Sequence, residues 1–320
     1  MNQEIKVSII CNVYNHEKYL RDALNGFVMQ ETDFPFEVLV HDDASTDSSA
    51  DIIREYEAKY PEIIKPIYQT VNQYSQKINI SHIFQQPRAQ GKYIAFCEGD
   101  DYWTDPKKLQ KQCDFLDAHP DYSMCVSSTT WLNMLTGRTE RRHIVEQDMD
   151  IPVEDIILEK NGRIFQLGSV VLRKDVWVQR PAWRSAFPIG DLALAIQAGL
   201  NGKVHMLADV MTVYRWYTDG SWTARMDTDE HRAAVSLRMI EGLTLLNEAT
   251  DHRYDAVISQ RLKRHKYIHA VMSHDLQAIR SPELRDIYNS RKWYYHVAVY
   301  IRCKFPKFYT RVLKPLIRSV

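Results

Sequence analysis

The chain of 320 residues carries 41 Lys+Arg and 41 Asp+Glu, and 45% of its residues are hydrophobic. This composition excludes a disordered chain, a collagen-like chain and a disulfide-rich miniprotein, and the length suits one large domain with an appendage or two unequal domains. Apolar runs such as residues 297–301 are far shorter than the roughly 20 residues of a membrane-spanning helix. The first ten residues show no signal-peptide pattern, so we expect a cytoplasmic protein.

Strands and helices alternate through the first part of the chain. Residues 5–11 form an apolar run of strand length, and apolar side chains then recur at helical spacing over residues 19–28. A second strand is predicted over residues 36–40. The polar turn 41–47 ends it, and a further helix begins near Ser48.

Two more strands are predicted over residues 63–68 and 93–97, and the second of them ends in Glu98-Gly99-Asp100-Asp101. The resulting order βαβαβ…β implies an α/β fold with a mostly parallel central sheet flanked by helices. In such sheets, ligands bind beyond the carboxyl ends of the strands. Both acidic clusters, at residues 42–47 and 98–101, follow strands directly.

Carboxylates crowded at neighbouring strand ends repel one another, which is typical of sites where a cation or a polyol ligand compensates. A hard divalent ion, Mg²⁺ or Mn²⁺, binds carboxylate and phosphate oxygens together, usually with only one or two protein carboxylates. Across a diphosphate it stabilises the departing charge. The sequence contains neither a P-loop nor a G-x-G-x-x-G loop, which argues against ATPases, kinases and NAD enzymes.

Three segments, VSIICNVYN at 7–15, EVLVHDDASTD at 37–47 and GKYIAFCEGDDYW at 91–103, resemble in order and spacing those of bacterial family 2 glycosyltransferases with the GT-A fold. The resemblance extends over roughly residues 5–225. It implies that a sugar is transferred with inversion from a nucleotide diphosphate donor, which we expect to be a UDP-sugar. The acceptor would be a hydroxyl of a glycan or of a lipid-linked molecule in cell-envelope polysaccharide synthesis.

The resemblance also implies roles for individual residues. The first acidic residue of the family's D-D-x-S-T-D turn meets the nucleobase, which here is Asp42, and Asp43 lies beside the ribose. Glu98 and Asp100 stand where the family has its D-x-D motif. Asp100 would bind the metal, Mn²⁺ or Mg²⁺, and Glu98 would lie near the ribose or reach the ion through water. Glu98 is a mild departure, because the family has Asp at that position.

Two residues outside the motifs complete the expected site. Asp191 stands where a loop enters a helix and resembles the family's acidic residue on the acceptor side, so it is our candidate for the base that removes the acceptor proton. Capping of that helix is the alternative. Arg215 is a candidate diphosphate contact, with pairing to the acidic cluster as the alternative. Relatives often have a His two residues after this Arg, where the chain has Tyr217.

Tryptophan and cysteine residues give weaker signals. Trp103 and Trp222 could stack on sugar rings, although tryptophan is more often part of a core. The five cysteines form no C-x-x-C pair and show no zinc spacing, and Cys11 and Cys97 lie in apolar, strand-like runs. We therefore expect reduced and unpaired thiols.

The charges are distributed unevenly along the chain. Residues 252–320 contain 15 Lys+Arg and 4 Asp+Glu, a net charge of +11, which leaves −11 for residues 1–251. Helix-like spacing recurs over residues 231–250, 253–278 and 282–303. The sequence thus predicts an acidic α/β part followed by a basic helical part.

We accordingly expect a GT-A catalytic domain over residues 1–228 and a helical C-terminal region over residues 229–320. Basic residues are interleaved with aromatic ones from residue 291 to residue 320, which favours contact with an anionic membrane, here its inner face. Packing on the acidic body or a subunit contact are the alternatives. No nucleic acid partner is expected.

Other functions compete with glycosyl transfer. A GT-A module could bind a nucleotide without catalysis and serve as a partner protein, but Asp42, Asp100 and Asp191 are all present. A sugar-nucleotide nucleotidyltransferase usually has a Gly-rich, basic loop after the first strand, and residues 12–17 contain none. A glycan hydrolase would leave the turn at residues 42–47 without a role.

Overall fold

The structure, a computed structural model, describes residues 4–141, 144–160, 165–218 and 228–313. It divides into two compact units. The first comprises residues Met1–Arg180 and Leu194–Thr218, and the second comprises Pro181–Ala193 and Asp219–Val320. The domain boundary expected between residues 228 and 229 stays a prediction.

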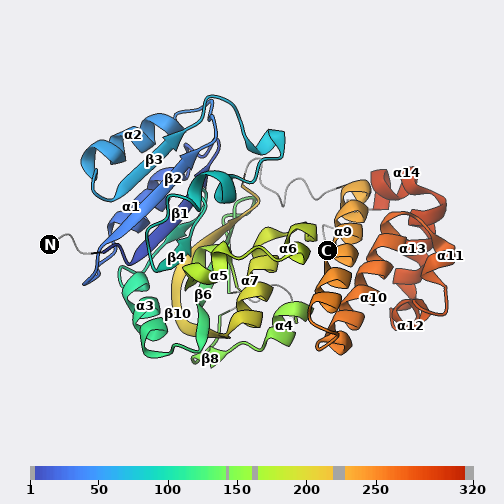
Figure 1. Ribbon diagram of the computed structural model, residues 1–320. Helices are drawn as coiled ribbons and strands as arrows, with labels where there is room; N and C mark the ends of the chain where they lie inside the picture. Colours follow the sequence, from blue (N-terminus) through green and yellow to red (C-terminus); the bar gives the residue numbers. More distant parts are fainter. Residues whose placement is uncertain (1–3, 142–143, 161–164, 219–227, 314–320) are drawn as a thin grey trace. The chain divides into compact units, whose positions relative to one another are not determined.

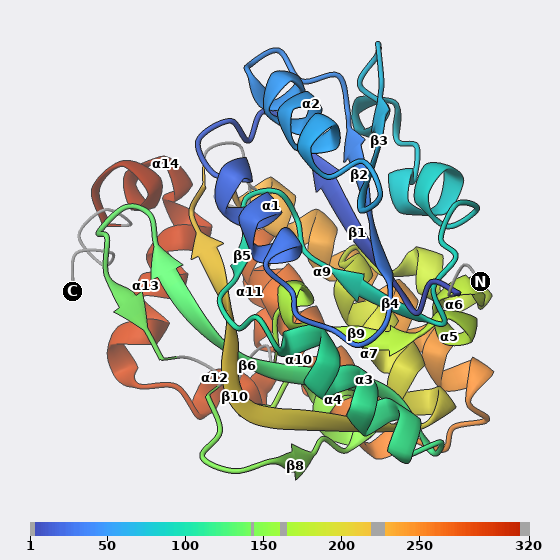
Figure 2. The same cartoon turned by 90° about the vertical axis from the view of Figure 1, so that its left-hand side faces the viewer.

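The first unit is built on one sheet with the strand order β3-β2-β1-β4-β9-β6-β10-β5, with β7 and β8 paired to β6 and β10 (Figure 2). Strands β3, β2, β1 and β4 are parallel, and so are β6 and β10, whereas β9 runs antiparallel between β4 and β6. The expected mostly parallel sheet is confirmed. The strands are β1 Val7–Val13, β2 Phe36–Asp42, β3 Ile64–Tyr68, β4 Tyr93–Phe96, β5 Tyr102–Trp103, β6 Tyr122–Asn133, β7 Thr139–Glu140, β8 Met149–Asp150, β9 Val171–Arg173 and β10 Lys203–Trp216.

Helices lie between the strands along the chain of the first unit (Figure 1). Three short turns of other helical types, η1 Tyr74–Gln76, η2 Ser81–Gln85 and η3 Leu167–Ser169, connect them in the first unit. The helices that begin before residue 202 are α1 Leu20–Val28, α2 Ser49–Lys59, α3 Lys108–Ala118, α4 Val153–Leu158, α5 Lys174–Val178, α6 Ala182–Ala186 and α7 Gly190–Asn201.

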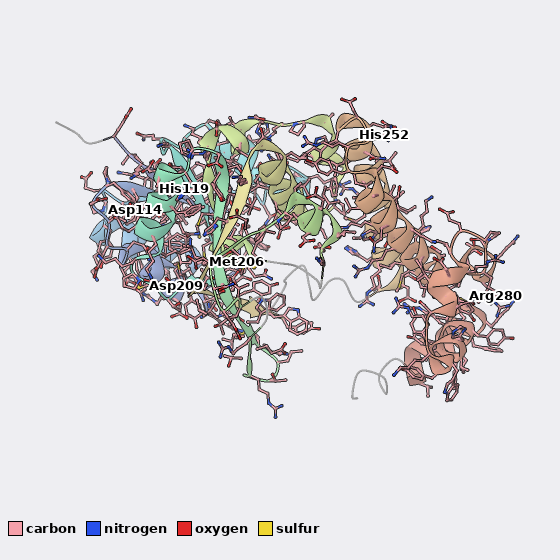
Figure 3. The ribbon with its side chains drawn as sticks, turned by 90° about the horizontal axis from the view of Figure 1, so that it is seen from below. Asp114, His119, Met206, Asp209, His252 and Arg280 are labelled. Carbon is pink, nitrogen blue, oxygen red and sulfur yellow. The ribbon has the colours of Figure 1, made fainter. Side chains whose placement is uncertain are left out.

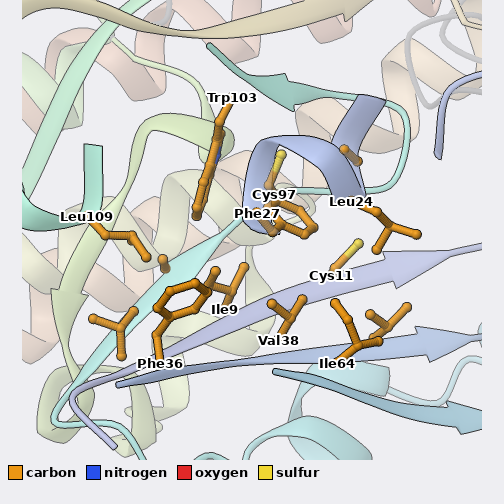
Figure 4. Packing of buried hydrophobic residues seen from close by; sticks show 14 of the residues in the cluster. Ile9, Cys11, Leu24, Phe27, Phe36, Val38, Ile64, Cys97, Trp103 and Leu109 are labelled. Carbon is orange, nitrogen blue, oxygen red and sulfur yellow. The ribbon is translucent and has the colours of Figure 1, made fainter. Parts of the chain in front are cut away.

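The main hydrophobic core lies on the face of the sheet that α1, α2 and α3 cover (Figure 4). Because side chains alternate between the two faces of a strand, Val7, Ile9 and Cys11 of β1 all enter this core. The opposite face is covered as well, since Phe96 of β4 meets Trp177 of α5 with ring centroids 5.8 Å apart. Nearly all residues of β1, β2 and β4 are buried, so ligands can reach these central strands chiefly at their ends.

Trp103 belongs to this core and is 2% exposed. Its ring meets Phe27 edge to face at 5.0 Å, and its indole N–H donates to the carbonyl of Gly168 at 2.8 Å (Figure 4). A sugar ring cannot stack on a side chain enclosed in this way. The core interpretation of Trp103 is thus confirmed, whereas Trp222 lies outside the described residues.

The second unit is helical. Its helices after residue 228 are α9 Asp229–Ala249, α10 Asp255–Met272, α11 Leu276–Ile279, α12 Arg285–Asn289, α13 Trp293–Lys304 and α14 Pro306–Phe308, followed by the turn η4 Tyr309–Leu313. Helix α9 buries Met239, Leu243 and Leu246, as their spacing predicts. Gly242 lets this helix approach Phe187 closely, because an added Cβ would lie 2.6 Å from that ring.

The helices expected over residues 253–278 and 282–303 are each interrupted, which the sequence reading missed. Helix α10 ends at Met272, because His274 adopts a left-handed φ of 59° and Asp275 then caps α11 through the N–H of Ala278 at 2.9 Å. In Figure 3, His252 marks the turn between α9 and α10, and Arg280 marks the end of α11. The chain turns again between α12 and α13.

The cysteines and the lengths of the helices can also be compared with the sequence-based expectations. All five cysteines are free, and all except Cys303 are buried, so the prediction of unpaired thiols is confirmed. Among the helices of the described residues, none combines the length and apolar character needed to cross a membrane.

Candidate active site

The predicted acidic residues lie at one edge of the sheet. Strands β1 and β2 are parallel and end together, with Val13 opposite Asp42, and β4 runs parallel to β1 on its other side. The loops after these three strands therefore meet. Strand β10 brings a fourth loop, because Val213 pairs with Tyr102 of β5 next to the Glu98–Asp101 turn.

Asp42 is buried and only partly hydrogen-bonded. Its side chain is 2% exposed, and Oδ2 accepts the Ser45 N–H at 3.3 Å. Oδ1 is buried without a hydrogen-bond partner among the described residues. Burial raises the pKa of this carboxyl above its ordinary value. A buried acceptor without a donor is costly, so this oxygen is suited to the N–H of a ligand.

Asp43 is fully engaged with the chain itself. Oδ1 accepts the Gln73 N–H at 2.7 Å, and Oδ2 accepts the Tyr74 N–H at 3.0 Å. The Asn72 side chain donates to the Asp43 carbonyl at 3.1 Å. Asp43 thus fixes the loop that follows β3 beside Asp42, and its expected place near a ribose stays a prediction.

The Glu98–Asp101 turn presents three carboxylates with different partners. Glu98 accepts the Asn12 side-chain amide at 3.3 Å. Asp100 is half-buried, and its Oδ2 accepts the Thr218 hydroxyl at 2.8 Å. Asp101 is 7% exposed and accepts the Arg215 main-chain N–H at 2.8 Å. Burial, followed by the charge of Asp100, raises the pKa of Asp101 well above its ordinary value.

Arg215 links this turn to helix α1. Its guanidinium donates to the Asp100 carbonyl at 2.9 Å and forms an ion pair with Asp22. The rings of Tyr102 and Tyr19 flank it, with centroids 4.4 and 5.2 Å from its Cζ. The guanidinium of Arg215 thus pairs with Asp22, outside both acidic clusters, and contacts the turn only at the Asp100 carbonyl, so contact with a diphosphate stays a prediction.

His16 lies directly under the acidic turn and was missed by the sequence reading. A Cβ on Gly99 would approach its Nδ1 to 2.8 Å, so a larger residue at position 99 would force the His16 ring to move. This Nδ1 is buried without a partner among the described residues, and burial lowers the pKa of the ring. The main chain of His16 is held by Ser49 Oγ at 2.9 Å. The signal for it was only its adjacency to the first motif.

Asp191 lies in the first turn of α7, where its Oδ1 accepts the N–H of Leu192 at 2.9 Å. It belongs to the segment Pro181–Ala193, which is part of the second unit. The structure thus brings together Asp42, Asp43, Glu98, Asp100 and Arg215 at the strand ends of the first unit. The assignment of Asp191 as base stays a prediction.

A metal would find few protein ligands here. Within the described ranges, no three His, Cys, Asp or Glu side chains are arranged to hold an ion. Tyr217, in the position of the His that relatives often carry, stacks on Trp216 at 4.3 Å. The half-buried Asp100 carboxylate accepts the Thr218 hydroxyl at Oδ2. One or two carboxylates suit Mg²⁺ or Mn²⁺, which take their other ligands from water and phosphate.

Comparison with known proteins decides the family. The model of "Glycosyl transferase family 2" matches residues 8–177, more than half of the chain. The chain belongs to glycosyltransferase family 2. An uncharacterised protein of Mycobacterium tuberculosis is 38% identical over 219 residues, which are 68% of this chain and 60% of the relative. The chain thus spans about 60% of the length of that relative.

Solved structures agree on the fold. Residues 1–349 of TarS from Staphylococcus aureus, crystallised with UDP-GlcNAc, align with a TM-score of 0.61 and 18% identity over 93% of this chain and 81% of that one. TarS is a poly(ribitol-phosphate) beta-N-acetylglucosaminyltransferase, 31% identical over 118 residues, 36% of this chain and 19% of TarS. A Pyrobaculum calidifontis mannosyltransferase bound to GDP-Man and Mn²⁺ aligns with a TM-score of 0.53, 13% identity and 95% and 82% coverage. The GT-A expectation is confirmed.

Proposed function

We propose that this protein transfers a sugar from a nucleotide diphosphate donor, a UDP-sugar, to a hydroxyl of a glycan or lipid-linked acceptor, with inversion and with the help of Mn²⁺ or Mg²⁺. The observation that carries the proposal is the set of acidic strand ends, where Asp42 keeps a buried oxygen without a partner among the described residues, and Asp100 follows β4 at the same end of the sheet. Membership of family 2 and the UDP-GlcNAc complex of TarS support it.

Asp42 is the proposed nucleobase contact. Uracil offers one ring N–H between two carbonyls, and the unpaired Oδ1 of Asp42 would accept that N–H. Ser45 holds the other carboxylate oxygen, so the side chain is oriented before the ligand arrives. Asp43 would act on the ribose side mainly by holding the Gln73–Tyr74 main chain in place.

Asp100 is the proposed metal ligand, with Glu98 nearby or joined through water. The ion, when bound, would neutralise charge that develops on the leaving diphosphate. Thr218 fixes one oxygen of Asp100, and Arg215 fixes its carbonyl, so that the side chain is held before the donor binds. The positive charge of Arg215 would offset part of the repulsion between the carboxylates and the diphosphate.

Asp191 is the proposed base. An inverting displacement requires the acceptor oxygen to attack the anomeric carbon from the face opposite the diphosphate. A carboxylate in reach of that oxygen would take its proton as the new bond forms. Cell-envelope polysaccharide synthesis, at the cytoplasmic face of the membrane, is the proposed setting.

The test is a screen of nucleotide sugars for slow donor hydrolysis, with Mn²⁺ and with EDTA. We expect one UDP-sugar to be hydrolysed, and only in the presence of the metal. Asp100→Ala should abolish this turnover, whereas Asp191→Ala should keep donor affinity and lose transfer to an acceptor. Asp114→Ala, which changes an exposed carboxylate of α3, is the matched control. Metal-independent hydrolysis, or equal activity in all variants, would contradict the proposal.

A further inference from the structure

Helix α13 carries an exposed face made of large apolar and aromatic side chains. Trp293 is 77% exposed and Tyr294 is 55% exposed, although both are residue types that usually bury much of their surface. Positions 293, 297, 300 and 304 follow one another at helical spacing on this face. We use the name aromatic face for these exposed side chains together with those that follow α13: Trp293, Tyr294, Val297 and Tyr300 of α13, Phe305, Phe308 of α14, and Val312 of η4.

Other residues of α13 attach the helix to the rest of the second unit. Val299 is 3% exposed and packs in a hydrophobic cluster with residues of α10, α11 and α12, and Tyr295 and Cys303 join it. Arg302 donates through Nε to Asp229 at 2.9 Å, which ties α13 to the start of α9. The second unit therefore does not use the aromatic face for its own core.

The segment that carries the aromatic face is strongly basic. The sequence has eight Lys+Arg and no Asp or Glu from residue 291 to residue 320. Within the described part of that segment, five basic side chains are exposed, namely Arg291, Lys292, Lys304, Lys307 and Arg311. In contrast, Lys263 and Lys266 of α10 pair with Asp286 and Glu283 at 2.7 and 2.6 Å. For the five exposed basic side chains near the aromatic face, no ion pair is seen among the described residues, so apolar surface and positive charge occur together in this segment.

We propose that the aromatic face binds the surface of a bilayer containing anionic lipids. Trp and Tyr rings are the side chains that favour the membrane–water interface, and basic residues beside them are attracted to anionic headgroups. Helix α13 has 12 residues and is about 18 Å long at 1.5 Å per residue, too short to span a hydrocarbon core of about 30 Å. It would lie in the plane of the interface, with Val297 and Phe308 entering the acyl boundary.

Apolar side chains favour this partner over a nucleic acid. A phosphate backbone would use the basic residues and could stack bases on the rings, but it offers nothing to Val297 or Val312. The biological purpose of this membrane contact rests on the proposed function, because binding would bring the enzyme to the surface where a lipid-linked acceptor lies. The binding itself can be measured without donor or acceptor.

The experiment is a flotation assay of the full chain with vesicles of phosphatidylglycerol and phosphatidylcholine, compared with phosphatidylcholine alone. We expect binding to the anionic vesicles only, weakened by high salt. The double variant Trp293→Ala/Tyr300→Ala should lower the partition coefficient about tenfold or more, because it removes the apolar anchors. Lys304→Glu/Lys307→Glu should remove the preference for phosphatidylglycerol.

Controls separate the aromatic face from general effects. Leu237→Ala changes another exposed apolar side chain of the second unit, on α9, and Arg253→Glu changes another exposed basic one. Both should bind vesicles like the wild type. Thermal unfolding should be unchanged in all four variants, and donor hydrolysis in solution should also be unchanged, since none of these residues belongs to the proposed site.

Several outcomes would overturn the proposal. The wild-type protein could ignore phosphatidylglycerol vesicles, or both double variants could bind them as well as the wild type does. Binding to an RNA oligonucleotide without binding to vesicles would assign the surface to nucleic acid. A dimer in sedimentation that the aromatic variant dissociates, again without vesicle binding, would assign it to a second copy. Vesicle binding by a chain that hydrolyses no donor would contradict the proposed function alone.

Discussion

Two carboxylates, the buried Asp42 in the first unit and the partly buried Asp229 in the second, differ in how their charge is compensated. Asp42 is 2% exposed, and burial raises its pKa while one oxygen lacks a partner. Burial alone would also raise the pKa of Asp229, but hydrogen bonds from Arg302 and His274 lower it. The carboxylate with complete partners stabilises the fold, whereas we propose that the unpaired oxygen of Asp42 accepts a hydrogen bond from a ligand.

The largest effect on stability is expected from breaking the complete pair. Asp229→Ala leaves Arg302, which is 8% exposed, without its partner, and this should cost about 3–5 kcal/mol of unfolding free energy. Chemical denaturation measures it. In a double-mutant cycle with Arg302→Met, the two single costs should not add, because the second change removes the uncompensated charge. If Asp229→Ala lowered the unfolding free energy by less than about 1 kcal/mol, as expected for a surface ion pair, Asp229 would not be the stabilising partner of Arg302 described above.

Asp42→Asn should weaken donor binding without lowering the stability of the fold. The amide keeps an acceptor for the Ser45 N–H and removes a buried charge, so stability at neutral pH should be equal to or higher than that of the wild type. Donor affinity should fall about tenfold, or about 1.4 kcal/mol, because a charged acceptor for the nucleobase is lost. Calorimetric titration with UDP checks the affinity. A destabilised variant with unchanged affinity would make Asp42 a structural residue.

Acid should affect the two carboxylates in opposite directions. Asp229 has a lowered pKa in the folded state, so its contribution to stability is present above the unfolded pKa and is lost as the pH falls through the folded pKa. Asp42 has a raised pKa, so its unfavourable contribution fades as the pH falls through that value. The stability gap between the wild type and Asp42→Asn should therefore narrow on acidification. Denaturation curves over a pH series measure both trends.

Asp22→Asn should have the smallest effect on the fold and a clear effect on turnover. The Asp22 side chain is 54% exposed, so loss of its ion pair with Arg215 should cost at most about 1 kcal/mol of stability. We expect donor hydrolysis to fall several-fold and the Mn²⁺ concentration for half-maximal rate to rise, because Arg215 also holds the Asp100 carbonyl. Arg21→Gln, which breaks the exposed pair with Glu55 on the same helix, is the control.

The sequence was sufficient for the parts of the site that are local. The strands and the acidic turns at their ends follow from apolar runs and from motifs within a few residues, and the structure places Asp42 and Asp100 accordingly. The ion pair between Asp22 and Arg215 joins positions 193 residues apart, and no local sequence pattern predicts it. The helix break at His274 was missed for a related reason, since a left-handed residue other than glycine leaves the apolar spacing intact.

The central claim is that the strand-end carboxylates bind a divalent ion together with a nucleoside diphosphate. Calorimetric titration of UDP into the wild type with Mn²⁺, into the wild type with EDTA, and into Asp100→Ala with Mn²⁺ tests it directly. We predict tight binding in the first titration and at least about tenfold weaker binding in the other two. Equal affinity in all three, or no binding of UDP in any of them, would contradict the account.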